Sequence, residues 1–319
     1  MKKLTLLALS LCLPALAQTP QFHVALSGQF GNFTGLSEGL AIQGYDGTPG
    51  AQGYGAAPVT YDMKSKTPLQ LDLGITNGDD DFTLSYWAGK AKGNGSFTAP
   101  VGGNTQYYSP YASYLNQIGM SNGNSEVKAH TLDIIWTRTF VKNDKGSLAF
   151  SFGLREFKVE RNMFLDQWGT GSSPLPHMGN DQISATSKGF GLLAGLSGRY
   201  TFTDRVWLTG GMKFAMTDGK NDFSYTETYD PAYSAGRRNP YLQVALDGQK
   251  QTSLQVDMDL KLNVNFVAGF DGFVGYQVKS FRDVLGNDAG AAYGSNTLSN
   301  NAPRTVGFNG VVVGVGYRF

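Results

Sequence analysis

The sequence has one cysteine, few charged residues and no long hydrophobic run after its first residues. Lys and Arg number 26 against 25 Asp and Glu, a net charge of +1, with 16% of residues charged. A balance this even excludes a nucleic-acid binder that neutralises phosphates with a basic stripe. No later stretch approaches the about 18 consecutive apolar residues of a transmembrane helix, so a helical membrane protein is excluded as well.

The N-terminal residues are typical of a secretory signal peptide. Two lysines precede an apolar run over 4–13, and small residues follow up to Ala17. The apolar run is too short to span a membrane, and we expect cleavage after Ala17. Cys12 would leave with this segment, so we expect no disulfide framework. A lipoprotein, with Cys12 lipidated, is disfavoured because Leu11 is large. The predicted organisation is a signal peptide over 1–17 and a single domain over 18–319.

Alternation of apolar and polar residues is the main secondary-structure signal in the rest of the chain. It is clearest from Leu254 to Val264, where every second residue is apolar. Such a pattern is typical of a β-strand with one apolar face. The predicted strands are 22–30, 69–75, 82–88, 132–140, 148–154, 190–202, 206–216, 254–264, 266–278 and 311–319.

The connections between these strands alternate between long and short. The long ones are 31–67, 91–126, 161–182, 218–252 and 281–304, and short turns fall near 77–78, 141–146, 203–204 and 265. An even number of strands with all long connections at one end is typical of outer-membrane barrels. We therefore predict an all-β fold, an up-and-down antiparallel transmembrane β-barrel of about ten strands, with eight or twelve as alternatives. Long loops would be extracellular and short turns periplasmic.

Two features favour this barrel over a secreted β-sandwich. The polar strand faces are rich in glycine, as at Gly191, Gly195 and Gly314, rather than in the charged residues of a sandwich exterior. Aromatic residues fall where the strands reach the short turns, as expected for an interfacial girdle. They are Phe22, Phe82, Phe140, Tyr200, Phe202, Phe266, Tyr317 and Phe319.

The last strand carries a resemblance to a known class. Residues 311–319 alternate to a terminal phenylalanine and resemble the C-terminal signature of Gram-negative-type outer-membrane proteins. The resemblance implies that Tyr317 and Phe319 form an assembly signal and that the barrel-assembly machinery is a partner during biogenesis. The Gly-rich hairpin over 188–216 is similar to the Legionella major outer-membrane protein family, which implies a pore-forming or surface-exposed role.

By the alternation, charged residues of both signs face the lumen. They are Asp72, Asp133, Arg155, Arg199, Lys213, Asp257, Asp259, Lys261, Asp271, Lys279 and Arg318. Ten strands enclose a narrow passage at best. The leading hypothesis is a narrow diffusion pore for ions or small solutes, with these residues as its walls. The alternative is a closed barrel, plugged by ion pairs among them, that serves as a surface binding, adhesion or structural protein.

The long connection over 91–126 contains a helix pattern. Ser109 and Pro110 suit a helix start, and Tyr111, Tyr114, Leu115 and Ile118 share one face. We predict a short helix over 110–118 that folds over the barrel entrance and constricts it. Tyrosines are frequent in the long connections, as in antibody paratopes, which favours a binding surface.

No catalytic or cofactor motif stands out. Of three histidines only His130 lies near the outer rim, and Asp133 is on the opposite strand face by parity. We expect no enzyme activity, cofactor, bound metal or nucleic acid. The expected partners are outer-membrane lipids and small solutes or ions, and the sequence does not define the oligomeric state.

Two places break the alternation. Trp87 and Trp207 fall on the lumen face, and Phe157 and Val159 are out of phase with the strand before them. A β-bulge in each strand would restore the phase.

Overall fold

The structure is a computed structural model that describes residues 19–35, 42–44, 62–99, 106–108, 118–169, 177–230, 242–285 and 304–319. Within these ranges, ten antiparallel strands close into a barrel, and β2 (Ile42–Gly44) pairs with β5 (Gln106–Tyr108) in a separate small sheet. The prediction of a ten-stranded up-and-down barrel is therefore confirmed. The barrel strands are β1 (Gln21–Thr34), β3 (Asp62–Asn77), β4 (Asp80–Thr98), β6 (Ile118–Asn143), β7 (Gly146–Gly169), β8 (His177–Thr203), β9 (Val206–Tyr229), β10 (Leu242–Val267), β11 (Phe270–Val284) and β12 (Arg304–Arg318).

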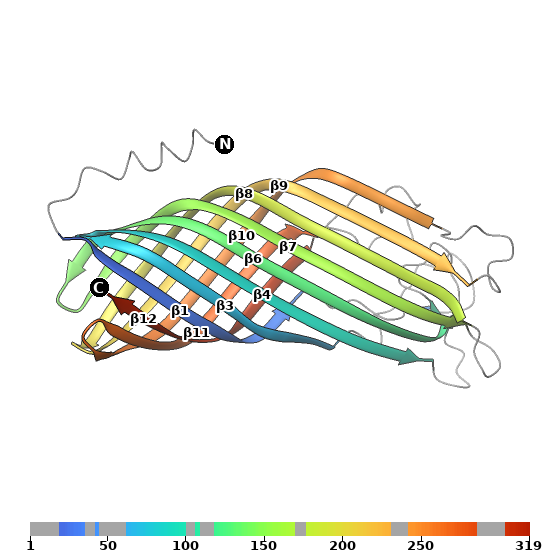
Figure 1. The fold of residues 1–319 in the computed structure, drawn as a ribbon, viewed down its shortest axis with the longest axis horizontal. Helices are drawn as coiled ribbons and strands as arrows, with labels where there is room; N and C mark the ends of the chain where they lie inside the picture. Colours follow the sequence, from blue (N-terminus) through green and yellow to red (C-terminus); the bar gives the residue numbers. More distant parts are fainter. Residues whose placement is uncertain are drawn as a thin grey trace.

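Tight turns join the strands at one end of the barrel (Figure 1). The turns are the two-residue segments 78–79, 144–145, 204–205 and 268–269. Gly78 and Gly269 have positive φ angles of 65° and 81°, which glycine adopts without steric cost. The last turn corrects a predicted boundary, because Phe266 lies in β10, which ends at Val267, instead of beginning the next strand. The first and last strands, β1 and β12, pair antiparallel from His23 to Thr34 and so close the ring.

The strands differ greatly in length around the ring. β6 to β10 have 24–27 residues, whereas β1, β3, β11 and β12 have 14–16. The longer strands project beyond the others at the end opposite the tight turns (Figure 1). Much of the chain expected as long loops is therefore strand. β7 continues to Gly169, and β8 begins at His177.

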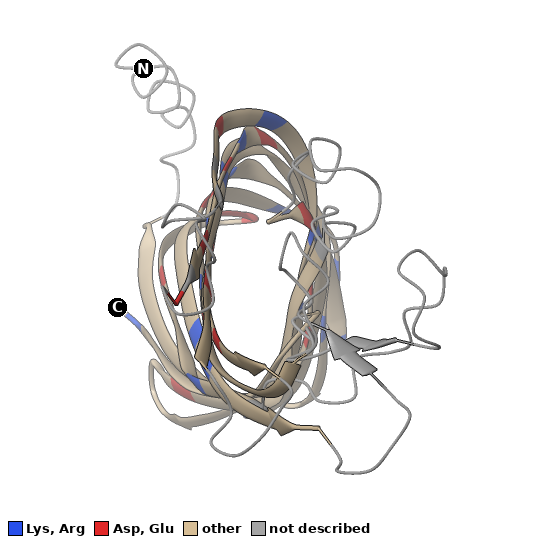
Figure 2. Ribbon diagram, turned by 90° about the vertical axis from the view of Figure 1, so that its right-hand side faces the viewer, with Lys and Arg blue, Asp and Glu red and all other residues tan. Residues whose placement is uncertain are grey.

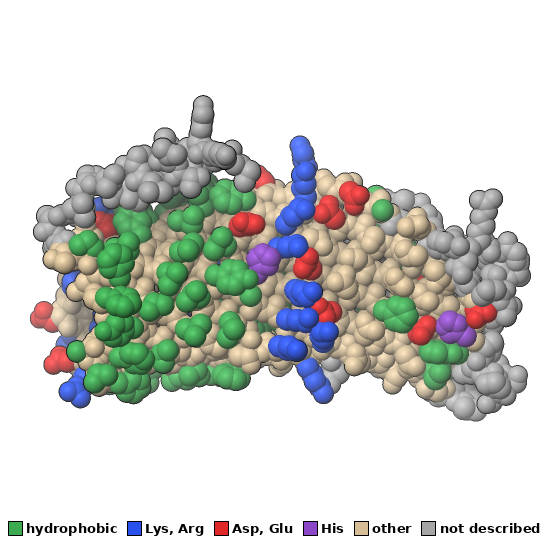
Figure 3. Space-filling model, in the orientation of Figure 1, with side chains coloured by type: hydrophobic (Ala, Val, Ile, Leu, Met, Phe, Trp, Pro, Cys, Tyr) green, Lys and Arg blue, Asp and Glu red, His purple; other side chains and the backbone are tan. Residues whose placement is uncertain are grey.

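A belt of exposed apolar side chains surrounds the half of the barrel next to the tight turns (Figure 3). On β10 its outward residues run from Leu254, 38% exposed, to Phe266, 63% exposed. At a rise of about 3.3 Å per residue and a tilt of about 40°, these residues cover about 30 Å along the barrel axis, the thickness of a bilayer's hydrocarbon core. Phe22, Phe140 and Phe202 lie at the edge of the belt nearest the turns and are more than half exposed.

Beyond this belt the polarity of the two barrel faces exchanges. On β7, Leu148 and Phe152 point outward and Arg155 inward, but farther along Phe157 and Val159 are buried inside. The pairing of β7 with β8 is continuous through this region, so no bulge separates the two halves. Trp87 likewise lies inside in an uninterrupted register with β6. The proposed bulges are therefore absent from β7 and β4 at these positions, although β3 carries a register shift between Lys66 and Leu69 beside Trp87.

The same correction applies to Trp207. It lies inside the barrel, 5% exposed, and pairs with Asn263 in a register that continues from Val206 to Asn221 without a shift. On its other side, the pairing of β9 with β8 shifts between Thr201 and Thr203, so the extra residue lies on β8 and not on the strand of Trp207. The interior of the barrel thus contains large rings as well as small residues, and its filling cannot be inferred from the alternation alone.

The predicted helix over 110–118 lies almost wholly outside the described residues. Tyr111, Tyr114 and Leu115 belong to the segment 109–117, which is not described. Ile118, expected as the last residue of the helix, is the first residue of β6 and is fully buried. Among the described residues there is no helix long and apolar enough to span a membrane.

Candidate functional site

The interior of the barrel contains a chain of ion pairs that crosses from one wall to the other. Figure 2 shows the strands closing into a flattened ring with charged residues around it. The Nε and Nη2 groups of Arg155 on β7 donate hydrogen bonds to the Asp133 carboxylate on β6 at 2.7 and 2.6 Å. The same Nη2 donates to Asp257 on β10 at 2.6 Å, and Lys279 Nζ on β11 reaches Asp257 at 2.8 Å. Because β8 and β9 separate β7 from β10 in the ring, the chain spans the lumen.

This ionic chain is removed from water. Arg155 has no exposed surface, and Lys279 and Asp257 are 3% and 7% exposed. The neighbour of Arg155 on β8 is Gly191, where the backbone of β9 comes so close that a Cβ atom would lie 2.0 Å from the Met216 carbonyl oxygen. Buried charges need partners of opposite sign, and alternating Asp133, Arg155, Asp257 and Lys279 provide them.

Amide side chains and a tryptophan extend the chain across the remaining strands. Trp87 Nε1 on β4 donates to Gln29 Oε1 on β1 at 2.9 Å, and Lys279 Nζ lies 5.2 Å from the Trp87 ring centre. Gln29 Nε2 donates to Gln277 on β11, which in turn donates to Gln70 on β3 at 3.4 Å. The sequence analysis missed these amides because it considered only charged residues; glutamine at inward positions of facing strands was the available signal.

An aromatic layer covers this polar layer on the side of the projecting strands. Phe33 and Phe308 lie 5.5 Å apart between ring centres, and Phe157 and Phe281 lie 6.3 Å apart. Trp87 contacts Phe281 and Phe308 at 6.1 and 6.0 Å and so joins the two pairs. All five rings are at most 6% exposed. Buried apolar residues such as Val127 and Leu165 continue this core into the projecting part of the barrel.

The half of the lumen near the tight turns is more open to solvent. Its charged residues are half-buried or exposed and form local contacts. Asp259 contacts Lys261 at 3.0 Å with 23% and 21% of their side chains exposed, and Asp271 forms an ion pair with Arg318. Three predicted lumen residues remain. Asp72 accepts hydrogen bonds from Gln70 and Ser85, and Arg199 lies 4.4 Å from the Trp207 ring centre. Lys213 pairs with Gly195 and Asp257 in the sheet.

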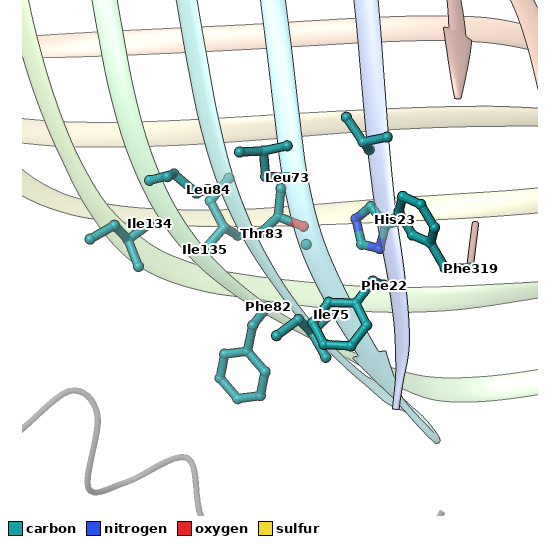
Figure 4. Close-up of a pocket in the computed structure, with 12 residues that line it drawn as sticks. Phe22, His23, Leu73, Ile75, Phe82, Thr83, Leu84, Ile134, Ile135 and Phe319 are labelled. Carbon is teal, nitrogen blue, oxygen red and sulfur yellow. The ribbon is translucent and has the colours of Figure 1, made fainter. Parts of the chain in front are cut away.

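The two residues of the predicted assembly signal lie at the seam of the barrel. The rings of Tyr317 and Phe319 meet edge to face at 4.9 Å, and the Phe319 N–H donates to the Phe22 carbonyl at 2.9 Å. Beside them an apolar groove of about 670 Å³ runs over β1, β3 and β4 to β6, and Leu73 and Ile134 also line it (Figure 4). It belongs to the outer belt, so lipid chains can fill it.

The three histidines lie at different places in the barrel. His23 Nδ1 lies 3.5 Å from both the Thr76 hydroxyl and the Asp81 carboxylate near the tight turns. His130 lies outside on β6, 6.3 Å between ring centres from Tyr86, whereas Asp133 lies inside. His177 at the projecting end contacts Asp166 at 3.0 Å and Asp230 at 3.5 Å. Across the described ranges, no group of three His, Cys, Asp or Glu residues is placed to hold a metal ion.

A closed hydrogen-bonded ring with an apolar outer belt of bilayer thickness defines an integral β-barrel of the outer membrane, because a membrane-spanning sheet must leave no unpaired edge. No protein-family model matches the chain, and no curated protein sequence does. The similarity of 188–216 to the Legionella family thus stays a prediction.

Solved structures with distant similarity include the outer-membrane protease OmpT of Escherichia coli. It has a TM-score of 0.45 and 11% identity, over 96% of this chain and 100% of that chain. The translocator domain of the autotransporter NalP from Neisseria meningitidis has a TM-score of 0.38 and 14% identity, over 100% and 95%. A major outer membrane protein from Thermus thermophilus has a TM-score of 0.37 and 11% identity, over 95% and 100%. Similarities this distant carry no argument about function.

Proposed function

We propose that this protein is a closed outer-membrane barrel that works at the cell surface as a binding protein. The observation that carries the proposal is the buried chain from Asp133 through Arg155 and Asp257 to Lys279. Charged groups that are paired with one another and withdrawn from solvent brace the lumen and offer little to replace the hydration shell of a passing ion. The aromatic layer around Trp87 adds a second, apolar barrier.

The outer wall of the projecting strands supports the binding role. A groove of about 500 Å³ crosses β6, β7, β8 and β9 on the outside of this wall. Its neutral hydrogen-bonding side chains are Asn124, Asn162, Gln182, Ser184, Ser224 and Thr226, and the Glu126 carboxylate, which contacts Lys90 and Lys128, also lines it. Amides and hydroxyls both donate and accept hydrogen bonds, so the groove suits a ligand rich in polar groups. A barrel that only conducts needs no such wall beyond the membrane.

A narrow pore for ions or small solutes is the second candidate. The observation that favours it is the mixed charge of the more open half of the lumen, where Asp259 and Lys261 remain accessible. Under this alternative the buried chain would be a gate that opens, and the half-exposed residues would form the walls of the passage.

Planar-bilayer recording separates the two. We expect no stepwise current from barrels that migrate as folded on unheated gels. The variant R155A/W87A removes the central residue of each barrier layer and should introduce current. The matched control K261A/W207A removes a lysine and a tryptophan from the open half and should stay silent. Reproducible stepwise current from the unaltered protein would refute the closed barrel and favour the pore.

A further inference from the structure

A band of outward-facing lysines runs across seven adjacent strands at the outer edge of the apolar belt, and Figure 3 shows part of it on the face in view. Each strand contributes at least one lysine, with Lys64 and Lys92 as second lysines on β3 and β4, and neighbours in the band are paired in register or displaced by one outward position. We call this set the lysine band: Lys66, Lys90, Lys128, Lys158, Lys188, Lys220 and Lys250 on β3, β4, β6, β7, β8, β9 and β10.

The band follows the end of the belt closely on every one of these strands. On β8 only one residue separates Phe190 from Lys188, and on β9 three residues separate Met216 from Lys220. Three intervening residues correspond to about 10 Å along the barrel axis, which is near the depth of the headgroup layer. Lysine side chains are long enough to reach back toward this layer.

The arrangement is unfavourable without a counterion. Lys158 pairs directly with Lys188, Lys188 with Lys220, and Lys220 with Lys250. Like charges directly opposite one another destabilise a sheet, and here four follow in succession. Adjacent strands lie about 4.8 Å apart, so the four positive charges form a row of about 14 Å.

Carboxylates of the chain neutralise the band only in part. Glu126 contacts Lys90 at 2.8 Å and Lys128 at 3.1 Å. Within the row of four, Glu160 contacts Lys158 at 2.5 Å and Asp222 lies 3.5 Å from Lys188. For Lys220 and Lys250 no carboxylate in the described part of the chain lies within 4.0 Å. The row from β7 to β10 therefore keeps an excess of positive charge.

We propose that the lysine band binds the phosphate groups of anionic lipid headgroups in the outer leaflet. Ammonium groups bind phosphate as point charges, and the row presents several at the depth where lipid phosphates lie. Bound headgroups would separate the like charges of neighbouring strands. The proposal is independent of whether the lumen conducts.

Lipid selectivity tests this. The full chain is reconstituted in phosphatidylcholine vesicles with trace spin-labelled phosphatidylglycerol or phosphatidylcholine, and the motionally restricted fraction is measured. One lysine near a lipid phosphate corresponds to about a fivefold preference for the anionic lipid. We therefore expect a preference of at least this size at low salt, and a markedly smaller preference at high salt.

The variant K188Q/K220Q should lose most of the preference. The matched control K142Q/K145Q removes the same charge from the opposite rim and should keep most of the lipid preference. Heat-dependent gel migration verifies that both variants are folded. The proposal is overturned if the unaltered chain shows no preference, if both variants lose it equally, or if inorganic phosphate abolishes it at an ionic strength where chloride does not.

Discussion

Removing Arg155 should destabilise the barrel far more than removing a comparable cation from the open half of the lumen. Arg155 has no exposed surface and makes three hydrogen bonds, of 2.6–2.7 Å, to two carboxylates. Arg155→Met keeps much of the volume but leaves Asp133, itself 2% exposed, without its cation. Breaking a buried ion pair by removal of one partner costs about 3–5 kcal/mol. Lys279 still contacts Asp257, so we expect the lower part of this range.

The matched control is Lys261→Met. Its ammonium lies 3.0 Å from Asp259, but 21% of the lysine side chain is exposed, so water can replace it. Pairs of this kind contribute about 0–1 kcal/mol. Reversible urea unfolding from vesicles, followed by tryptophan fluorescence, gives both free energies of unfolding. A further substitution, Asp133→Asn, should recover part of the loss in Arg155→Met because it removes the unpaired charge.

The result that would refute this reasoning is a loss below about 1 kcal/mol for Arg155→Met, equal to that of the control. Water would then have access to the Asp133 carboxylate. The buried chain could not be a seal, and the closed barrel would lose its main support.

Two further predictions concern the outer surface and the seam. Leu260→Lys, in the middle of the belt, should cost about 2–4 kcal/mol, whereas Ser184→Lys on the projecting wall should stay within about 0.5 kcal/mol, both measured by the same unfolding titration; equal costs would contradict the position of the belt. Deletion of Phe319 removes the backbone hydrogen bond to Phe22 and should lower the yield of heat-modifiable protein in the outer-membrane fraction. Deletion of one residue within 286–303 should leave that yield unchanged, and equal yields of the two deletions would show that the C-terminal residue is dispensable for assembly.

The membrane half of the fold could be predicted from the sequence because lipid outside and polar groups inside impose a strict alternation. Leu254 to Val264 follows it over its whole length, and the ten strands inferred in this way are present. The projecting half could not be predicted by the same rule. There the outside is water and the inside is packed, so Phe157 and Val159 point inward while Lys158 points outward. Because this exchange looks like a loss of phase, the predicted strands end too early, and residues predicted as loops are strand in the structure.

The candidate site was only partly accessible to sequence reasoning. Parity identified Asp133, Arg155, Asp257 and Lys279 as lumen candidates one strand at a time. It gave no information on which of them meet across the lumen, because the contact of Arg155 with Asp257 joins strands that are not neighbours in the sheet. The lysine band was missed for a related reason. Its members fell in the predicted connections, as Lys66, Lys220 and Lys250 do, or between a connection and a predicted strand, so no strand period gave the direction of their side chains.

The pairing of β1 with β12 determines when this barrel can be completed. Adjacent barrel strands along the chain pair with each other, so most hairpins can form as soon as both strands are present. The last seam instead joins residues 23–34 to 307–318, which come first and last among the barrel strands. Until β12 arrives, β1 and β11 expose backbone N–H and C=O groups that hydrocarbon cannot satisfy. Insertion can therefore be completed only after translation and export are finished. Until then, an incomplete chain has to be kept out of the lipid or held by another protein.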